Sequence, residues 1–241
     1  MLAMQALVGP DDEVVAVVPV WPNLTAQPAI LGARVTRLPL RAEQGAWKLD
    51  LDALCKAVTP ATRVLLVSSP NNPTGWTFTR AEQEAVLAHC RTTGSWIVAD
   101  EVNERVFFGD VEHAAAPSFL DIAEPGDGLL VVHSFSKSFL MTGWRLGWIV
   151  YPPPLESGFA KLIEFNTSCA PVFVQRAGLA AMRGAEASGL GATPAALLRY
   201  LAAAADCAAR RHRGRAEGWS LRLLPRRRPR RFAGPRQAAG H

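Results

Sequence analysis

The chain has 241 residues, of which 49% are apolar and 20% charged, a composition typical of a globular protein and unlike that of a disordered, collagen-like or coiled-coil chain. No apolar run approaches the roughly 18 residues of a membrane span, and the first residues lack the basic start and cleavage site of a secretory signal. The net charge of +5 is uneven, because residues 201–241 hold eleven of the 26 basic residues and two of the 21 acidic ones.

Short runs rich in β-formers alternate with helical stretches. A helix is predicted over residues 1–8, without an N-cap residue before it. A second helix starts at the capping box Thr79–Glu82 and ends before Gly94. The predicted strands are residues 13–18, 33–38, 63–67, 96–100, 129–133 and 146–150. Several are continuous apolar runs, as in strands buried on both faces. We therefore expect an α/β fold, with a mostly parallel central sheet and helices on both faces.

The last part of the chain differs from the rest. An Ala-rich stretch over 194–211 predicts a helix, and the arginine-rich sequence after it has no hydrophobic period. We expect residues 1–200 to form the large domain, and 201–241 to be a disordered or out-of-frame tail. The tail's arginines could neutralise phosphates, but no aromatic residues interleave with them, so nucleic-acid binding is a minor alternative.

The cysteines and histidines indicate neither a metal site nor a disulfide framework. The four cysteines are far apart, and the five histidines show no ligand spacing. A chain of this length without a disulfide framework is typical of a reducing compartment. We therefore expect a cytoplasmic protein.

Polar motifs follow several of the predicted strands at their carboxyl ends, where open α/β sheets bind ligands. Trp21 follows the first strand, the turn 69–75 follows the third, Asp100 ends the fourth, and the segment 134–138 follows the fifth; Arg145 precedes the sixth. Each motif alone has an ordinary explanation as a turn, a cap or a solvated charge. Because all of these motifs lie at the same edge of one predicted sheet, together they favour a binding site.

Together these side chains describe a site for an anionic aromatic ligand. Arg145 and the hydroxyls of Ser134 and Ser136 could hold a phosphate, and Trp21 could stack on a planar ring. Asp100, at the end of a buried strand, could pair with a protonated ring nitrogen.

Two further side chains complete the predicted site. Asn72 could bond a ring oxygen, and Lys137 could bind a carbonyl group. A lysine Schiff base, with a carboxylate on the pyridine nitrogen, is the protein half of pyridoxal phosphate chemistry.

At these residues the sequence resembles the class I/II aminotransferases of the fold type I pyridoxal-phosphate-dependent enzymes. The similar motifs are Ser-Pro-Asn-Asn-Pro-Thr-Gly at 69–75, Ala-Asp-Glu-Val at 99–102, Ser-Phe-Ser-Lys-Ser at 134–138 and Gly-Trp-Arg-Leu-Gly at 143–147. The resemblance covers about residues 1–200. It implies a large domain of that fold, pyridoxal 5′-phosphate as cofactor, amino acid and 2-oxo acid substrates, and a homodimer.

The resemblance also implies roles for single residues. Lys137 would form the Schiff base and carry the proton between the substrate Cα and the cofactor C4′, and Asp100 would keep the pyridine nitrogen protonated. Asn72 would bond the phenolic oxygen, and Trp21 would stack on the ring.

The remaining roles concern the phosphate and one departure from the family pattern. Ser134 and Arg145 would bind the phosphate, and Ser136 has no fixed role. Asn103 stands where the family usually has a tyrosine that also bonds the phenolic oxygen, so a shifted pKa of the Schiff base is expected.

Other parts of the family pattern are not found in this sequence. They are the glycine-rich phosphate turn before the first helix, an edge strand, the N-terminal arm that reaches the partner subunit, and most of the small domain with its substrate-carboxylate arginine. We therefore expect an impaired fragment. One alternative is a carbon–sulfur lyase of the same fold, because amino transfer and carbon–sulfur cleavage both begin with removal of the Cα proton. The other alternative is a non-catalytic remnant or sensor domain.

Overall fold

The computed structural model describes residues 1–107 and 115–188, all within one compact unit, Met1–Leu201. The predictions for the 194–211 helix and for the tail lie outside these residues. The elements follow in chain order: α1 (Leu2–Leu7), β1 (Glu13–Val18), α2 (Pro22–Ile30), β2 (Arg34–Pro39), β3 (Arg41–Glu43), β4 (Ala46–Lys48), α3 (Leu51–Ala57), β5 (Thr62–Ser68), α4 (Arg80–Thr93), β6 (Trp96–Asp100), η1 (Phe119–Asp121), β7 (Leu129–Ser134), α5 (Phe135–Ser138), η2 (Thr142–Trp144), β8 (Gly147–Val150), η3 (Pro153–Leu155), α6 (Glu156–Asn166) and α7 (Val172–Ser188).

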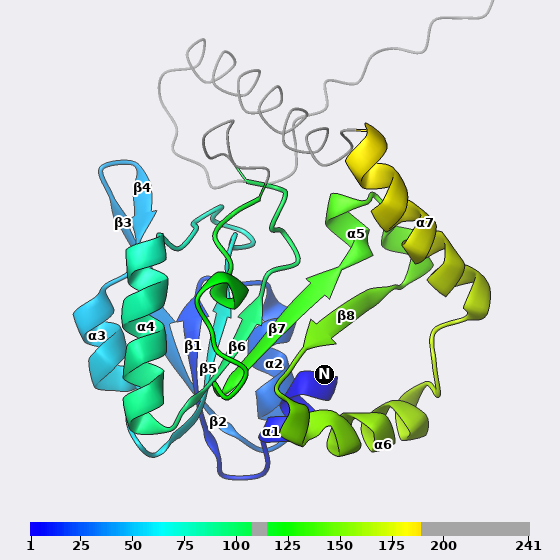
Figure 1. Ribbon diagram of the computed structural model, residues 1–241. Helices are drawn as coiled ribbons and strands as arrows, with labels where there is room; N and C mark the ends of the chain where they lie inside the picture. Colours follow the sequence, from blue (N-terminus) through cyan, green and yellow to red (C-terminus); the bar gives the residue numbers. More distant parts are fainter. Residues whose placement is uncertain (108–114, 189–241) are drawn as a thin grey trace, which may run out of the picture. The chain divides into compact units, whose positions relative to one another are not determined.

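The predicted central sheet is present. Six strands form it in the order β2-β1-β5-β6-β7-β8, with every pairing parallel except that of β7 with β8 (Figure 1). The prediction of a mostly parallel sheet is therefore confirmed. The chain leaves β1 toward β2 and returns to β5 on the other side of β1, so the strand order reverses between β1 and β5. Open sheets of this type place ligands at the carboxyl edge near such a reversal.

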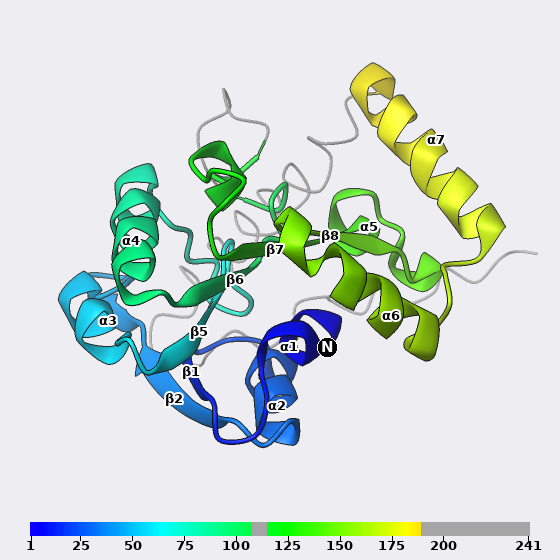
Figure 2. The ribbon, with the colours of Figure 1, turned by 60° about the horizontal axis from the view of Figure 1, so that its bottom comes forward.

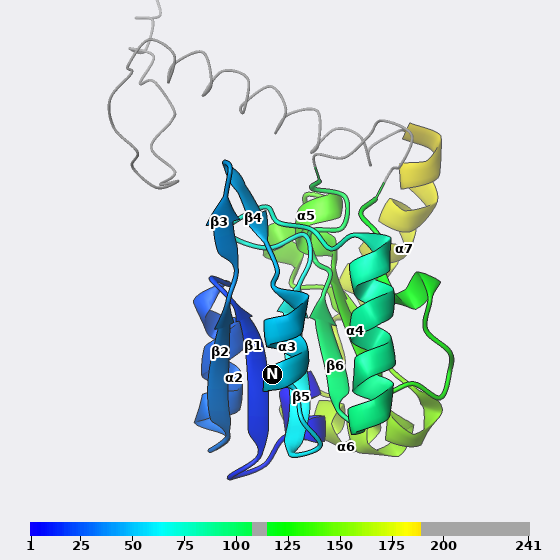
Figure 3. The same ribbon diagram turned by 90° about the vertical axis from the view of Figure 1, so that its left-hand side faces the viewer.

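Two apolar layers cover the sheet, because successive strand residues point to opposite faces. Val15, Leu65 and Ile97 face the layer formed with α3 and α4, and these two helices lie together over one face (Figure 3). Val14 and Leu66 face the layer that includes α1 and α6, which lie near each other on the other face (Figure 2). Burial on both faces explains why the central strands read as continuous apolar runs.

Helix α4 begins and ends where its sequence predicts. The Thr79 hydroxyl accepts from the Glu82 amide and the Glu82 carboxylate accepts from the Thr79 amide, which forms the capping box. Gly94 ends the helix with a φ of 73°, a left-handed conformation that glycine adopts without a Cβ clash. Helix α1 likewise has no side-chain N-cap, as the sequence indicates.

The two edges of the sheet differ in composition. The outer strand β2 carries Arg34, Arg37 and Pro39, which are residues that protect a sheet edge from further pairing. At the other edge, β8 is Gly-Trp-Ile-Val without a charge. No strand pairs with its outer side among the residues that the structure describes. None of the described helices is long and apolar enough to cross a lipid bilayer.

Candidate functional site

The carboxyl ends of four neighbouring strands carry the residues that the sequence singles out. Trp21 follows β1 as the residue before α2, Asn72 lies in the loop after β5, and Asp100 is the last residue of β6. Lys137 lies in α5, which follows β7 directly. Because β1, β5, β6 and β7 are parallel neighbours, their carboxyl ends lie at one edge of the sheet (Figure 1). The four residues follow or end these strands and therefore belong to that edge.

Arg145 reaches the same edge because β8 runs antiparallel to β7. The first residue of β8, Gly147, pairs with Ser134 at the end of β7, so the segment just before β8 lies beside the end of β7. The Arg145 guanidinium is exposed and donates to the Thr142 carbonyl at 2.8 Å. It forms no ion pair with any residue in the described ranges, so its charge is available to an anionic ligand.

Asp100 places a buried carboxyl group at this edge. Its side chain is only 8% exposed, and burial raises the pKa of the carboxyl to about 6, although the Val102 amide and the charge of His133 act in the opposite direction. Its strand partner Ser68 shares its face of the sheet, and the buried Ser68 hydroxyl has no hydrogen-bond partner among the described residues. Such a carboxylate suits a ligand group that shares a proton with it, as a pyridine nitrogen does.

The loop after β5 is built around Asn71, which leaves Asn72 exposed. The buried Asn71 side chain accepts from the amide and the hydroxyl of Thr74, at 3.2 and 2.9 Å. Asn103, which follows β6, donates its side-chain amide to the Pro70 carbonyl at 3.2 Å. Asn103 therefore ties the β6 end to the loop that carries Asn72.

The end of β7 forms a capped turn. The Ser134 hydroxyl accepts from the Ser136 amide at 3.1 Å and so caps α5. Lys137 is exposed, and no hydrogen bond or ion pair joins it to Asp100 within the described part of the chain. Trp21, which an isolated reading would assign to the core, is 47% exposed. An exposed amine and an exposed indole at this edge are groups that a planar carbonyl compound would contact.

Two buried residues beside the site, Glu101 and His133, escape the sequence analysis. Glu101 is 2% exposed and lies directly after Asp100. His133 is also buried, stacks on the Trp148 ring at 5.0 Å, and brings Nδ1 within 2.9 Å of a Glu104 oxygen, though without hydrogen-bond alignment. The only sequence signal is the adjacency of Glu101 to Asp100 and of His133 to Ser134. Strand alternation would have placed Glu101 and His133 on the opposite face from Asp100.

The donor set of this edge fits pyridoxal phosphate. A buried carboxylate suits the ring nitrogen, an exposed guanidinium with neighbouring hydroxyls suits the phosphate, and an exposed primary amine suits the carbonyl group. The residues that would supply these groups are Asp100, Arg145, Ser134, Ser136 and Lys137.

Comparison with known proteins places the chain among the aminotransferases. The profile of the family "Aminotransferase class I and II" matches residues 1–205. An aspartate aminotransferase of Musicola paradisiaca is 34% identical over 185 residues, which are 76% of this chain and 45% of that protein. An arginine–pyruvate transaminase of Pseudomonas aeruginosa is 34% identical over 179 residues, covering 74% and 44% of the two chains.

Solved structures show the same likeness. The N-succinyldiaminopimelate aminotransferase of Mycobacterium tuberculosis superimposes with a TM-score of 0.73 at 29% identity, over 87% of this chain and 52% of that one. A double mutant of the Thermus thermophilus aspartate aminotransferase gives 0.75 at 26% identity, over 83% and 50%. The chain thus spans about half the length of the relatives it matches.

Proposed function

The chain belongs to the class I and II aminotransferases, a family that depends on pyridoxal phosphate, and from this premise we propose that it acts in the transfer of an amino group between an amino acid and a 2-oxo acid. One observation supports the proposal most strongly. The buried carboxylate of Asp100 lies at the same sheet edge as the exposed amine of Lys137 and the exposed guanidinium of Arg145.

Lys137 and Asp100 divide the chemical work in this proposal. Pyridoxal phosphate, when bound, supplies a sink for the electron pair that remains when the substrate Cα loses its proton. Lys137 would hold the cofactor covalently and then take and return the Cα proton as a general base and acid. Asp100 would keep a proton on the ring nitrogen, and the same pairing would offset the cost of burying its charge.

The remaining residues would orient the cofactor. Arg145 and the hydroxyls of Ser134 and Ser136 would bind the phosphate. Trp21 would cover one face of the ring, and Asn72 would bond the phenolic oxygen.

A second group at that oxygen is proposed with a modified role. Asn103 would act there in place of the usual tyrosine, from a shorter side chain whose amide already donates to the Pro70 carbonyl.

Covalent trapping tests the proposal directly. The chain is mixed with pyridoxal phosphate, its absorbance is recorded, and the product is reduced with borohydride and digested for peptide mapping. We expect the label on Lys137, its loss in Lys137→Ala, and its retention in Lys161→Ala, which removes an exposed lysine of α6. Equal labelling of Lys161 and Lys137 would count against a specific site.

Product analysis then identifies the reaction. A panel of amino donors, with aspartate and arginine among them because relatives are named for these substrates, is offered together with 2-oxo acids. Formation of a new amino acid supports amino transfer. Release of ammonia from a cysteine-type donor would instead indicate a carbon–sulfur lyase, and cofactor binding without turnover would indicate a non-catalytic domain. The homodimer and the cytoplasmic location stay predictions.

A further inference from the structure

We propose that Glu101 is a positioning residue, which holds the segment 117–119 against the end of β6 and thereby fixes the strand end that carries Asp100 and the loop that carries Asn72. This inference rests on the proposed function in one respect, namely that Asp100 and Asn72 contact the cofactor. Glu101 itself points to the other face of the sheet and acts through its neighbours.

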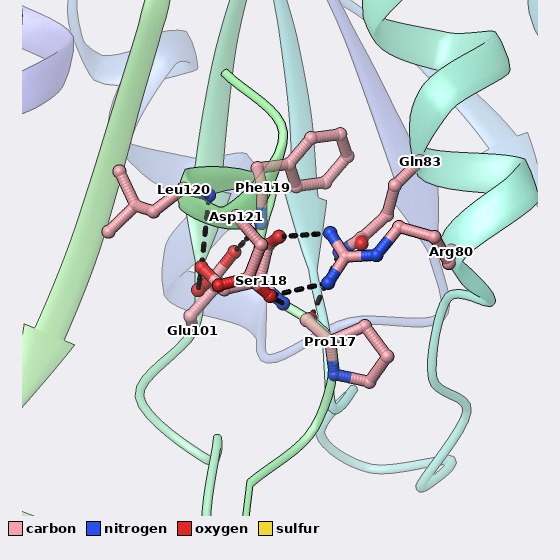
Figure 4. Close-up of polar contacts among 8 residues, drawn as sticks. All are labelled: Arg80, Gln83, Glu101, Pro117, Ser118, Phe119, Leu120 and Asp121. Carbon is pink, nitrogen blue, oxygen red and sulfur yellow. Dashed lines mark hydrogen bonds and ion pairs between the residues drawn. The ribbon is translucent and has the colours of Figure 1, made fainter. Parts of the chain in front are cut away.

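Glu101 is joined to the segment by two hydrogen bonds. One carboxylate oxygen accepts from the Ser118 hydroxyl at 2.5 Å and the other from the Phe119 amide at 2.9 Å (Figure 4). The side chain is 2% exposed, and burial raises the pKa of the carboxyl although both donors lower it. A buried carboxylate persists where such donors hold it, so removing it would free both donors at once.

The segment is also fixed from the side of helix α4. An Arg80 guanidinium nitrogen donates to the Ser118 carbonyl at 3.0 Å. The fully buried Gln83 donates to the Pro117 carbonyl, also at 3.0 Å. Figure 4 shows these side chains converging on the segment from α4, opposite Glu101. The segment therefore bridges the start of α4 and the end of β6.

An aromatic cluster connects the segment to the Asn72 loop. Phe119 is fully buried and packs edge-on against Phe78, with ring centres 5.4 Å apart. Phe78 in turn packs against Trp76, with ring centres 4.5 Å apart. The Trp76 carbonyl accepts from the Asn71 amide at 2.7 Å, and the Phe78 amide donates to the Ser69 hydroxyl at 3.1 Å.

The aromatic cluster thus packs against the loop that carries Asn72, and a displaced Phe119 would shift that loop. The β6 side is coupled as well, because the Ser69 amide donates to the Asp100 carbonyl at 3.1 Å. Loss of the Glu101 carboxylate would therefore affect both Asp100 and Asn72, although it touches neither side chain.

Hydrogen exchange of the cofactor-free chain tests the coupling without reference to activity. In Glu101→Ala we expect amides of 69–75 and 101–104 to exchange at least about tenfold faster, because two charge-assisted hydrogen bonds are lost. The control is Asp127→Ala, which breaks the ion pair with Arg91. Asp127 lies just before β7 and Arg91 lies in the last turn of α4. The pair is therefore near the amino ends of the strands, and exchange at 69–75 should stay unchanged.

Conservative variants keep the test decisive if Glu101→Ala does not fold. Glu101→Gln keeps the volume and can still accept from the Phe119 amide, while the Ser118 hydroxyl can turn to accept from the new amide. We expect an intermediate effect for it, and a similar one for Ser118→Ala. Faster exchange confined to 115–121 would overturn the proposal, because Glu101 would then anchor only its own segment.

Cofactor binding supplies the second measurement. In absorbance titrations, Glu101→Ala should bind pyridoxal phosphate about tenfold more weakly than the parent, with Glu101→Gln between them and Asp127→Ala equal to the parent. Equal affinity of Glu101→Ala and the parent would refute the positioning role. If the parent chain binds no cofactor, the proposed function fails, while the exchange data still decide whether Glu101 positions the end of β6 and the Asn72 loop.

Discussion

Replacing Asp100 by asparagine should stabilise the cofactor-free protein at neutral pH. The carboxyl has a pKa of about 6 in the folded protein and about 3.9 in an unfolded chain. Between these values the folded state keeps a proton that the unfolded state has lost, so the free energy of unfolding falls as the pH rises. Well above pH 6 the charged Asp100 costs about 3 kcal/mol, and the neutral Asn removes that cost at every pH.

Urea unfolding of both proteins between pH 4 and pH 8 measures the effect. We expect nearly equal stability at pH 4, and a difference that grows to about 3 kcal/mol at pH 8. The Val102 amide, which donates to an Asp100 carboxylate oxygen at 3.2 Å, can donate equally to the Asn oxygen. Added pyridoxal phosphate should then stabilise the parent more than the variant, because only the carboxylate can pair with a protonated ring nitrogen.

A matched substitution with the opposite sign serves as the control. Arg91 holds the pKa of Asp127 below its usual range, so Asp127→Asn should lose stability above pH 4, by about 1 kcal/mol, because the Arg91 side chain of the pair is exposed. Parallel stability curves for Asp100→Asn and the parent from pH 4 to pH 8 would refute the assignment of a buried, destabilising charge to Asp100.

Three further substitutions test other parts of the structure. Lys137→Ala should abolish amino transfer, whereas Asp100→Asn should bind the cofactor and lose most of the rate, as steady-state assays would show; equal rates for Asp100→Asn and the parent would contradict its role. Phe119→Ala empties a fully buried site and should lower the free energy of unfolding in urea by about 3–5 kcal/mol, and a loss below 1 kcal/mol would contradict its place in the aromatic cluster. Thr79→Ala removes the α4 cap and should cost about 1 kcal/mol in the same assay, with no change expected for Thr92→Ala on the exposed last turn.

The sheet could be predicted closely because its signals are local. The bounds predicted for β1 and β6 agree with the structure, since each is a continuous apolar run with polar or turn residues on both sides. The hairpin of β3 and β4 was missed, because all six of its strand residues are exposed and carry no apolar alternation. Its one signal is Gln44-Gly45, where both residues have positive φ, as two-residue hairpin turns require.

Site residues could be predicted only where they end or directly follow a strand that is recognisable in the sequence. Asp100 and Lys137 follow apolar runs, so their shared edge is predictable from the order of the elements. Glu101 could not be assigned a partner, because its contact with Ser118 joins residues 17 positions apart through an irregular segment. Long-range hydrogen bonds of this kind depend on how loops pack, which no periodicity encodes.

The unequal edges of the sheet limit how copies of this chain can associate through their strands. Arginine and proline on β2 oppose the addition of another strand there, whereas the uncharged β8 offers a single edge with no partner among the described residues. Two copies joined β8 to β8 would present only β2 edges outward. The arginines and the proline of β2 would then oppose the addition of a third copy, so strand pairing would give a closed dimer and not a fibre.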